Sequence, residues 1–436
     1  MSQVGQKRLL NNIASPYGLA MFSYALFVFA CLIPPSVYTR YMHEPDLMFL
    51  DPATILFYTL CVAAFLAGVW FLLKLFPPVP SVERKFETRI SPTVFLMVPL
   101  TIGIVVTIAL LFFLVERNPE ILVFLLAQQG SDLKEAVEFE IQGNLNLAPL
   151  MLTGIIWWAF WRWHDLGIQG WRNRLVKSTL VIAVLSVVAT ATLLLSRDLL
   201  ILVLCGLAIM YIARRSVNDQ VSFRFVLGTG TAIALCVALL FLSFSFLRGS
   251  DSLDDLVCQL LGYTVASYNR LAAIVDGHLR YPFADRGFYL SGFFAFNHTL
   301  NRLVPITRLM DWPDHLDDWG AQFGAVTRAG LDGRFIWSGA FGYIFSDLGW
   351  FSLPFLFGYG MLYGVVWNWI RRGNVLGVVL YPCVGFCVLF WVGSNYLLDS
   401  QPVILLVVAI MLGAYESLCA SRIKVLRPLL PVSPVG

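Results

Sequence analysis

Eight arginines stand in one stretch of the chain, residues 247–337, and they are the side chains best suited to chemistry. The same stretch holds ten aspartates, three of the five histidines and many aromatic residues, but no lysine and no glutamate. A guanidinium group captures phosphate in a planar, bidentate way, and aromatic rings offer flat surfaces on which sugars stack. The pattern therefore favours a ligand that carries phosphate and sugar. The alternative is a structured cap whose arginines pair with its own aspartates.

Three of the arginines are expected at one depth, near the outer boundary of the membrane. Arg197 lies in a tight turn between two apolar runs, Arg248 follows the next run, and Arg270 follows on an apolar helix that also carries Tyr263. Charges at such a boundary are costly unless they are used or paired, so we predict that these residues contact the ligand. The alternative for Arg197 is that it ends a helix with Asp198 and only reaches out to the interface.

Further candidates follow along the chain. His298, Arg302 and Arg308 form a second polar and cationic patch, and residues 314–318, with Asp317, form the densest acidic cluster. Such a cluster supplies a general base or oxygen ligands for a divalent cation, unless it is only a solvated turn or a set of counter-charges for arginine. Asp347 precedes an apolar run and is our first candidate for a base. The alternative is that Asp347 caps the following helix or pairs with a loop arginine.

Several classes of chemistry lack support in the sequence. No spacing of cysteine and histidine suggests zinc, and seven of the eight cysteines fall inside apolar runs. There is no phosphate-binding loop of the nucleotide type and no nucleophile-elbow motif. We therefore expect no metal, no cofactor and no nucleic acid, and neither a nucleotide-driven nor a nucleophilic hydrolase reaction.

The elements that must position these residues are membrane spans. The composition is 58% hydrophobic and 13% charged, with a mean hydropathy of +0.75, which excludes an ordinary soluble domain. Recurring apolar runs of about twenty residues predict an all-α, polytopic transmembrane bundle, with residues 1–436 forming a single integral membrane domain. We expect about ten spans, at 17–36, 53–73, 93–115, 146–161, 178–196, 199–213, 225–246, 350–370, 376–395 and 403–420.

The distribution of positive charge predicts the orientation. With a cytoplasmic N-terminus, eighteen of the 30 lysines and arginines fall on the inner side, eight in the long loop 247–337, and four in the other outer connections. This bias follows the positive-inside rule. We therefore expect a multi-pass protein with both termini in the cytoplasm. The long loop between spans seven and eight is then an outer cap or substrate-binding subdomain.

Two segments of the loop carry local signals. Residues 256–275 are apolar enough to cross the membrane, but a crossing would export the basic C-terminus, so we predict an amphipathic helix lying at the outer face with Arg270 on its polar side. Ser252 with Asp255 resembles a capping box before it, and Gly277 is suited to end it. Residues 338–348 are predicted as a short segment that enters the membrane before the eighth span.

At these residues the chain resembles a known family. The features are Ser196-Arg197-Asp198 in a tight outer turn, Arg248 after the next span, a long outer loop with Tyr and Arg on an apolar helix, and S-G-A-F-G-Y-I-F-S-D-L-G-W from Ser338 to Trp350. Together they look like the Wzy-type oligosaccharide repeat-unit polymerases of bacteria, which are related to the O-antigen ligases. The resemblance covers about 180–420 in layout. The ligases carry a histidine shortly before the span after the long loop, where this chain has Trp337-Ser338, and this difference favours a polymerase.

The resemblance implies a membrane glycosyltransferase in the bacterial inner membrane, with the long loop in the periplasm. Such an enzyme polymerises polyprenyl-pyrophosphate-linked oligosaccharide repeat units into a surface polysaccharide or exopolysaccharide. Its partners would be that lipid-linked oligosaccharide, membrane lipids and, as possible protein partners, a flippase and a chain-length regulator. The alternatives are a ligase-type glycan transferase and a flippase or transporter for the lipid-linked oligosaccharide.

Overall fold

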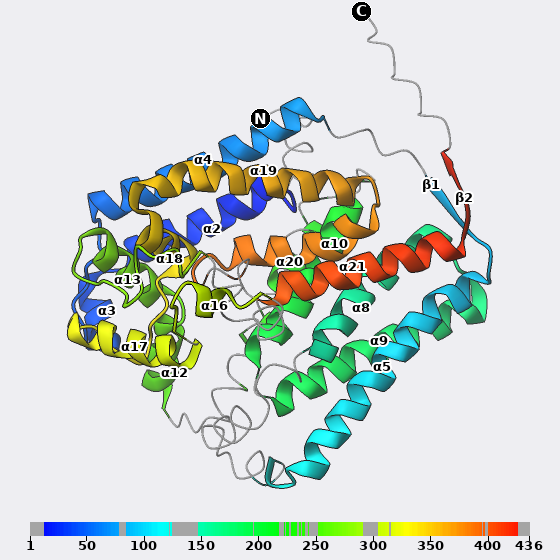
Figure 1. Ribbon diagram of the computed structural model, residues 1–436, viewed down its shortest axis with the longest axis horizontal. Coiled ribbons are helices and arrows are strands. Elements are labelled where there is room, and N and C mark those ends of the chain that lie inside the picture. The colour runs from blue at the N-terminus through cyan, green and yellow to red at the C-terminus, as the bar shows by residue number, and fades with distance from the viewer. Residues whose placement is uncertain are drawn as a thin grey trace, which may run out of the picture.

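The computed structural model describes residues 13–77, 84–121, 147–194, 196–217, 252–290, 304–313, 315–394 and 400–425, together with scattered positions between these ranges, most of them within 222–243. These residues are mostly helical, as predicted (Figure 1). The helices are α2 (Pro16–Cys31), α3 (Pro35–Met42), α4 (Pro52–Leu75), α5 (Pro92–Arg117), α8 (Leu147–Leu166), α9 (Gly170–Leu193), α10 (Arg197–Val217), α12 (Leu253–Gly262), α13 (Val265–Val275), α16 (Ile306–Leu309), α17 (His315–Arg328), α18 (Gly339–Leu348), η1 (Gly349–Phe351), α19 (Ser352–Arg371), α20 (Val375–Leu389) and α21 (Ser400–Cys419). Strands β1 (Arg84–Thr88) and β2 (Ala420–Val425) pair in antiparallel fashion.

Membrane character is supported by the length and composition of the helices. Within the described ranges, six helical segments are long and apolar enough to cross a membrane, or seven if the α2–α3 pair, bent by 89°, forms one span. Half of the residues of the predicted span at 225–246 lie outside the described residues, and the number ten remains a prediction. The predicted break before the eighth span is confirmed, because α18 ends at Leu348 and α19 begins at Ser352.

Helices begin where the local sequence favours it. Ser15 and Asp51 are the N-cap residues of α2 and α4, and each side chain accepts a hydrogen bond from a backbone amide of the first turn. A proline follows each cap, where its fixed φ suits the first turn and its missing N–H costs nothing. The predicted cap at Ser252 is also confirmed, since its hydroxyl accepts from the amide of Asp255 at 3.0 Å.

Helices α4 and α19 pack at backbone contact. A Cβ atom added at Gly68 would lie 1.9 Å from the carbonyl oxygen of Phe357, and one added at Gly360 would lie 2.0 Å from that of Phe65. Only glycine allows this approach, and small residues of this kind replace the missing hydrophobic driving force between helices in lipid. The close pair fixes α19, and with it α18, against the N-terminal helices.

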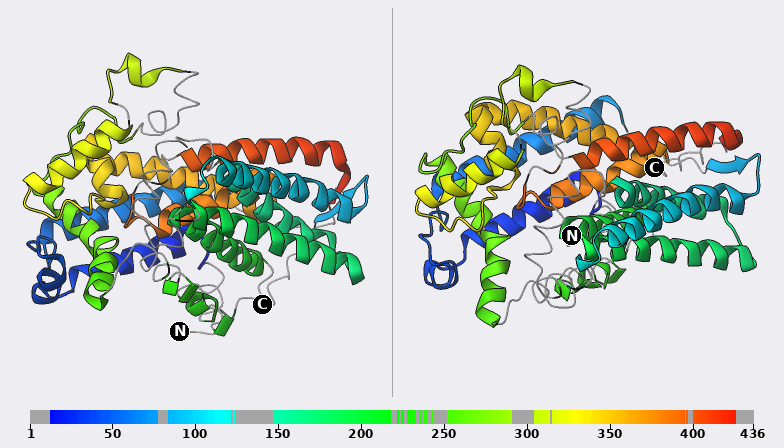
Figure 2. Two further views of the ribbon diagram at one scale, coloured as in Figure 1. Left: turned by 90° about the horizontal axis from the view of Figure 1, so that it is seen from below. Right: turned by 60° about the horizontal axis from the view of Figure 1, so that its bottom comes forward.

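The loop helices gather at one end of the molecule. Helices α3, α12, α13, α17 and α18 lie together at this end, whereas the β1–β2 sheet lies at the opposite end (Figure 1). A second hydrophobic cluster forms there beside the main core and includes Tyr281, Phe288, Tyr289, Val326 and Tyr343. The views in Figure 2 show the same separation, with the short α16 standing out from the body of the molecule. The described part of the loop is thus packed around a core of its own.

A buried ionic network joins α8, α10 and α21 with the connection between α19 and α20. Arg162 of α8 donates from Nε to Glu416 of α21 at 2.5 Å and from Nη2 to the carbonyl of Gly373, between α19 and α20, at 2.9 Å. Asp165 accepts from Arg162 at 3.0 Å and pairs with Arg214 of α10 at 2.7 Å. These contacts bring together the end of α8, the end of α10 and the connection between α19 and α20. The charge pattern predicts all three on the inner side of the membrane.

Candidate functional site

An arginine and a row of aromatic rings meet where three distant segments come together. Arg197 begins α10, and its Cζ atom lies 5.5 Å from the centroid of the Tyr263 ring. The Tyr263 ring lies 5.0 Å from that of Trp337, which in turn lies 6.3 Å from that of Trp319 on α17. We call Tyr263, Trp337 and Trp319 the aromatic row. All three rings are half-buried, so each keeps a face or an edge accessible.

Close packing holds the row in place. Tyr263 is the C-cap of α12, and the ring of the buried Phe335 lies 5.7 Å from it in an edge-on arrangement. Phe335 packs directly on Gly262, where an added Cβ atom would lie 2.2 Å from the ring. Arg334, whose side chain is 66% exposed, lies over the same Phe335 ring and pairs with Asp332 at 2.6 Å. A second, accessible guanidinium therefore belongs to the same aromatic group.

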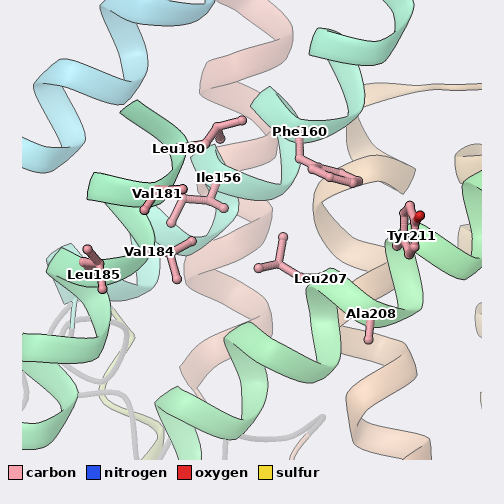
Figure 3. Close-up of a pocket in the computed structure, with 9 residues that line it drawn as sticks. All are labelled: Ile156, Phe160, Leu180, Val181, Val184, Leu185, Leu207, Ala208 and Tyr211. Carbon is pink, nitrogen blue, oxygen red and sulfur yellow. The ribbon is translucent and has the colours of Figure 1, made fainter. Parts of the chain in front are cut away.

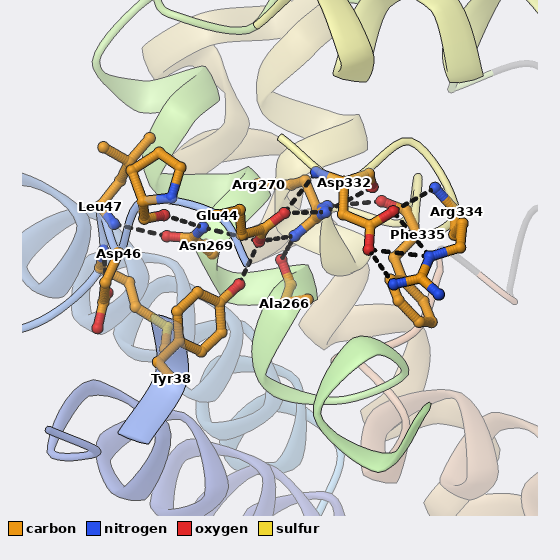
Figure 4. Close-up of polar contacts among 12 residues, drawn as sticks. Tyr38, Glu44, Asp46, Leu47, Ala266, Asn269, Arg270, Asp332, Arg334 and Phe335 are labelled. Carbon is orange, nitrogen blue, oxygen red and sulfur yellow. Dashed lines mark hydrogen bonds and ion pairs between the residues drawn. The ribbon is translucent and has the colours of Figure 1, made fainter. Parts of the chain in front are cut away.

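Arg270, a predicted phosphate contact, is fully buried and committed to partners within the protein (Figure 4). Its Nη1 and Nη2 atoms donate to the two carboxylate oxygens of Glu44 at 2.6 and 2.8 Å. The remaining donors reach the carbonyls of Phe335 at 2.5 Å, Asp332 at 2.8 Å and Ala266 at 3.1 Å. A guanidinium has five N–H donors, and all five are used here.

This geometry corrects two of our expectations. The segment 256–275 is not one surface helix, because α12 and α13 are separate and residues 265–274 of α13 are all buried. The polar stripe of α13 faces protein partners instead of water. Arg270 is therefore a positioning residue that holds the loop 332–335, and with it Trp337, instead of contacting phosphate.

Glu44 is the centre of this network, and the sequence interpretation missed it. Besides Arg270, it accepts from the Tyr38 hydroxyl, from Asn269 at 3.1 Å and from the amide of Asp332 at 2.5 Å. Asn269 also binds the 43–51 segment, accepting from the amide of Leu47 at 2.7 Å. The only signal in the sequence was the carboxylate of Glu44 in a short outer connection. Its partner Arg270 lies more than 200 residues away, so sequence spacing alone does not reveal the pair.

Asp318, in the predicted acidic cluster, points into the second core. It is 1% exposed and accepts from the Tyr289 hydroxyl at 3.1 Å and from the Gln322 amide at 2.6 Å. Burial raises the pKa of Asp318 to about 6, and these two hydrogen bonds oppose the rise only in part. Its neighbour Asp317, predicted to bind substrate, is exposed at the start of the same helix, two residues before Trp319.

Asp347, the first candidate for a base, lies near the end of α18. It is half-buried, and its Oδ2 atom accepts from the amide of Leu290 at 2.8 Å. The amide of Asp285 donates to the carbonyl of Ser346 at 2.9 Å, so the end of α18 holds the turn at 285–290. Among the described residues, the buried Oδ1 atom of Asp347 accepts no hydrogen bond. One oxygen of Asp347 thus anchors this turn.

The remaining predicted residues do not join this group. Arg308 is exposed on α16, the short helix that stands out from the body of the molecule (Figure 2). Arg248, His298 and Arg302 lie outside the described residues. Groups of three or more potential metal ligands do not occur within the described part of the chain.

Comparison with known proteins gives no relative for this chain. Neither a family model, nor a curated protein, nor a solved structure matches it. What the site does must therefore be argued from its own geometry.

Proposed function

We propose that the chain is a membrane glycosyltransferase that polymerises polyprenyl-pyrophosphate-linked oligosaccharide repeat units. The observation that carries this proposal is the position of Arg197 beside the aromatic row, at the N-terminal end of the apolar helix α10. A guanidinium there suits a diphosphate whose lipid tail stays among the helices, and the rings suit sugars that extend from that diphosphate.

The proposed topology is the one that the charge pattern predicts. About ten spans cross the bacterial inner membrane, both termini are cytoplasmic, and the loop 247–337 faces the periplasm. The gathering of α12, α13, α17 and α18 at the end opposite the basic β1–β2 sheet supports this assignment (Figure 1). The aromatic row then lies on the outer side, where a lipid-linked repeat unit is presented.

The reaction needs charge stabilisation more than any cofactor. An acceptor hydroxyl of the incoming repeat unit attacks the anomeric carbon of the growing chain, the bond from that carbon to the pyrophosphate oxygen breaks, and the electron pair leaves with polyprenyl pyrophosphate. Negative charge grows on the leaving group, and one well-placed donor to such charge is worth roughly 3–4 kcal/mol. Arg197 is the proposed donor, and Arg248, Arg302 and Arg308 are further candidates.

The acceptor proton requires a base, and Asp347 is the first candidate. Its Oδ1 atom is not committed within the described residues, whereas both oxygens of Asp318 already accept hydrogen bonds in the core. His298 is the second candidate. Tyr263 and Trp337 would hold the sugars, with Asp317 at the edge of the row.

The proposal is tested in cells that make the glycan. Deletion of the gene, followed by rescue with Arg197→Ala, should leave single repeat units on the lipid carrier, because loss of one such donor lowers the rate about 100-fold or more. The matched control is Arg280→Ala, which removes an arginine of the loop 247–337 whose ion pair with Asp285 is exposed on the surface.

Each outcome assigns a class. Chains of normal length with Arg197→Ala would refute the arginine mechanism. Full-length chains left on the carrier in the deletion strain would indicate a ligase. Loss of outward-facing repeat units would indicate a flippase.

A further inference from the structure

An open apolar groove lies between α8, α9 and α10, and no residue of the aromatic row lines it (Figure 3). Its volume is about 530 Å³. Two residues of its wall, Val181 and Leu185, are 58% and 59% exposed, so the groove opens to the outside of the bundle. The groove is lined by Ile156, Phe160, Leu180, Val181, Val184, Leu185, Leu207, Ala208 and Tyr211.

One end of the groove is marked by two aromatic rings. Phe160 of α8 and Tyr211 of α10 lie at this end in Figure 3, with ring centroids 6.4 Å apart. Leu185 and Val184 lie toward the other end. The two ends of the groove therefore differ in chemistry, because one carries aromatic rings and the other carries aliphatic side chains.

Each of the three helices that line the groove carries a basic side chain one helical turn beyond the aromatic end. On α8, Phe160 is followed by His164, and the two rings lie 5.1 Å apart. On α10, Tyr211 is followed by Arg215, whose Nη2 atom donates to the Tyr211 hydroxyl at 3.1 Å. On α9, Lys177 precedes Val181 by four residues. Residues three or four apart share a helix face, so all three basic groups border the same end.

Two of these groups, Lys177 and Arg215, are not neutralised by neighbouring acids. Asp165, the nearby carboxylate, is occupied by Arg162 and Arg214. Among the described residues, no carboxylate forms an ion pair with Lys177 or Arg215. The Lys177 ammonium lies over the Trp163 ring, 5.4 Å from its centroid, and the Arg215 guanidinium lies over Tyr211 at 5.3 Å. Aromatic rings hold both cations at the mouth of the groove without cancelling their charge.

We propose that the groove binds an acyl chain of an anionic glycerophospholipid, whose phosphate lies against Lys177 and Arg215. An apolar channel that ends in uncompensated positive charge is complementary to a lipid with a net negative headgroup. A zwitterionic lipid fits less well, because its own ammonium group would lie among these cations. This inference concerns a structural lipid and does not depend on glycosyl transfer.

Native mass spectrometry of the full-length protein in detergent tests the proposal. The protein is incubated with phosphatidylglycerol or with phosphatidylcholine of the same acyl chains, and bound lipid is counted. We expect one strongly retained phosphatidylglycerol per chain. Lys177→Gln and Arg215→Gln should each weaken its retention about fivefold, since a cation near a lipid headgroup contributes on the order of that factor. Both are polar surface changes that leave the bundle core intact.

A second variant fills the groove. Ala208→Trp should abolish the retained lipid, whereas Ile102→Trp, on an outward face of α5 that is 59% exposed, should not. The proposal would be overturned if the protein retained phosphatidylglycerol and phosphatidylcholine equally. It would also be overturned if the two tryptophan variants retained the same amount of lipid, or if the charge variants retained as much as the wild type. Retention of neither lipid by the wild-type protein would also overturn the proposal, because that result is expected if residues of the chain itself close the groove.

Discussion

Replacement of Glu44 by glutamine probes the network that holds the aromatic row. Glu44→Gln keeps the shape of the side chain but removes its charge beside the fully buried Arg270. Both carboxylate oxygens face donors only: Oε1 accepts from Tyr38, Asn269 and Arg270, and Oε2 accepts from Arg270 and the amide of Asp332. Whichever oxygen becomes an amide NH2 group therefore meets another donor.

The expected cost is large because a buried charge loses its partner. Removal of one member of a buried ion pair costs about 3–5 kcal/mol, and we expect Glu44→Gln to lie in that range. In thermal unfolding followed by intrinsic fluorescence in detergent, Tm should fall by roughly 5 °C. The double variant Glu44→Gln, Arg270→Met should cost less than the sum of the single variants, because it no longer buries an unpaired charge.

A surface pair supplies the control. Arg280 and Asp285 lie 2.5 Å apart, but their side chains are 74% and 65% exposed. Such pairs contribute no more than about 1 kcal/mol, so Arg280→Gln should leave Tm nearly unchanged. If Glu44→Gln unfolds at the same temperature as Arg280→Gln, or if the double variant is additive, the positioning role assigned to Arg270 is wrong.

Three further predictions follow from the packing and the site. Gly360→Ala should lower Tm by several degrees, because its Cβ atom would lie 2.0 Å from the Phe65 carbonyl oxygen. Gly358→Ala is the control and should leave Tm unchanged, because its Cβ atom would meet nothing within 4 Å. Burial raises the pKa of Asp318 from 3.8 to about 6, so the contribution of Asp318 to stability is largest below about pH 4 and falls by up to roughly 3 kcal/mol as the pH rises to about 6. Asp318→Asn should flatten this decline in Tm measured from pH 4 to 7, and an unchanged decline would contradict it. Trp337→Ala should reduce polymer yield roughly tenfold through lost stacking, measured against Trp171→Ala, which lies on α9 and is 68% exposed in the wild type.

Local features of the fold could be predicted from the sequence because they depend on neighbouring residues. The cap at Ser252 and the break between α18 and α19 follow from short-range hydrogen bonding and backbone preference. Gly277, expected to end a helix, has a φ of +77° two residues after α13 ends.

Burial of polar groups could not be predicted, because it depends on partners that are distant in sequence. The spacing of Ser267 and Arg270 is the same whether the stripe faces water or protein. The partner Glu44 lies 226 residues before Arg270, and nothing in the local pattern of either segment points to the other. The position of Arg197 beside Tyr263, and of Tyr263 beside Trp337, likewise depends on how segments distant in sequence pack. The sequence interpretation thus identified Arg197 and Tyr263 as candidates but not their aromatic neighbours.

Reconstitution tests the central proposal most directly. The purified protein in proteoliposomes receives a polyprenyl-pyrophosphate-linked repeat unit, and products are separated by chain length. We expect a ladder of polymers from the wild type and from Arg280→Ala, and at least about 100-fold less polymer from Arg197→Ala. A ladder from Arg197→Ala equal to that of the wild type, or no ladder from folded wild-type protein, would contradict the proposal.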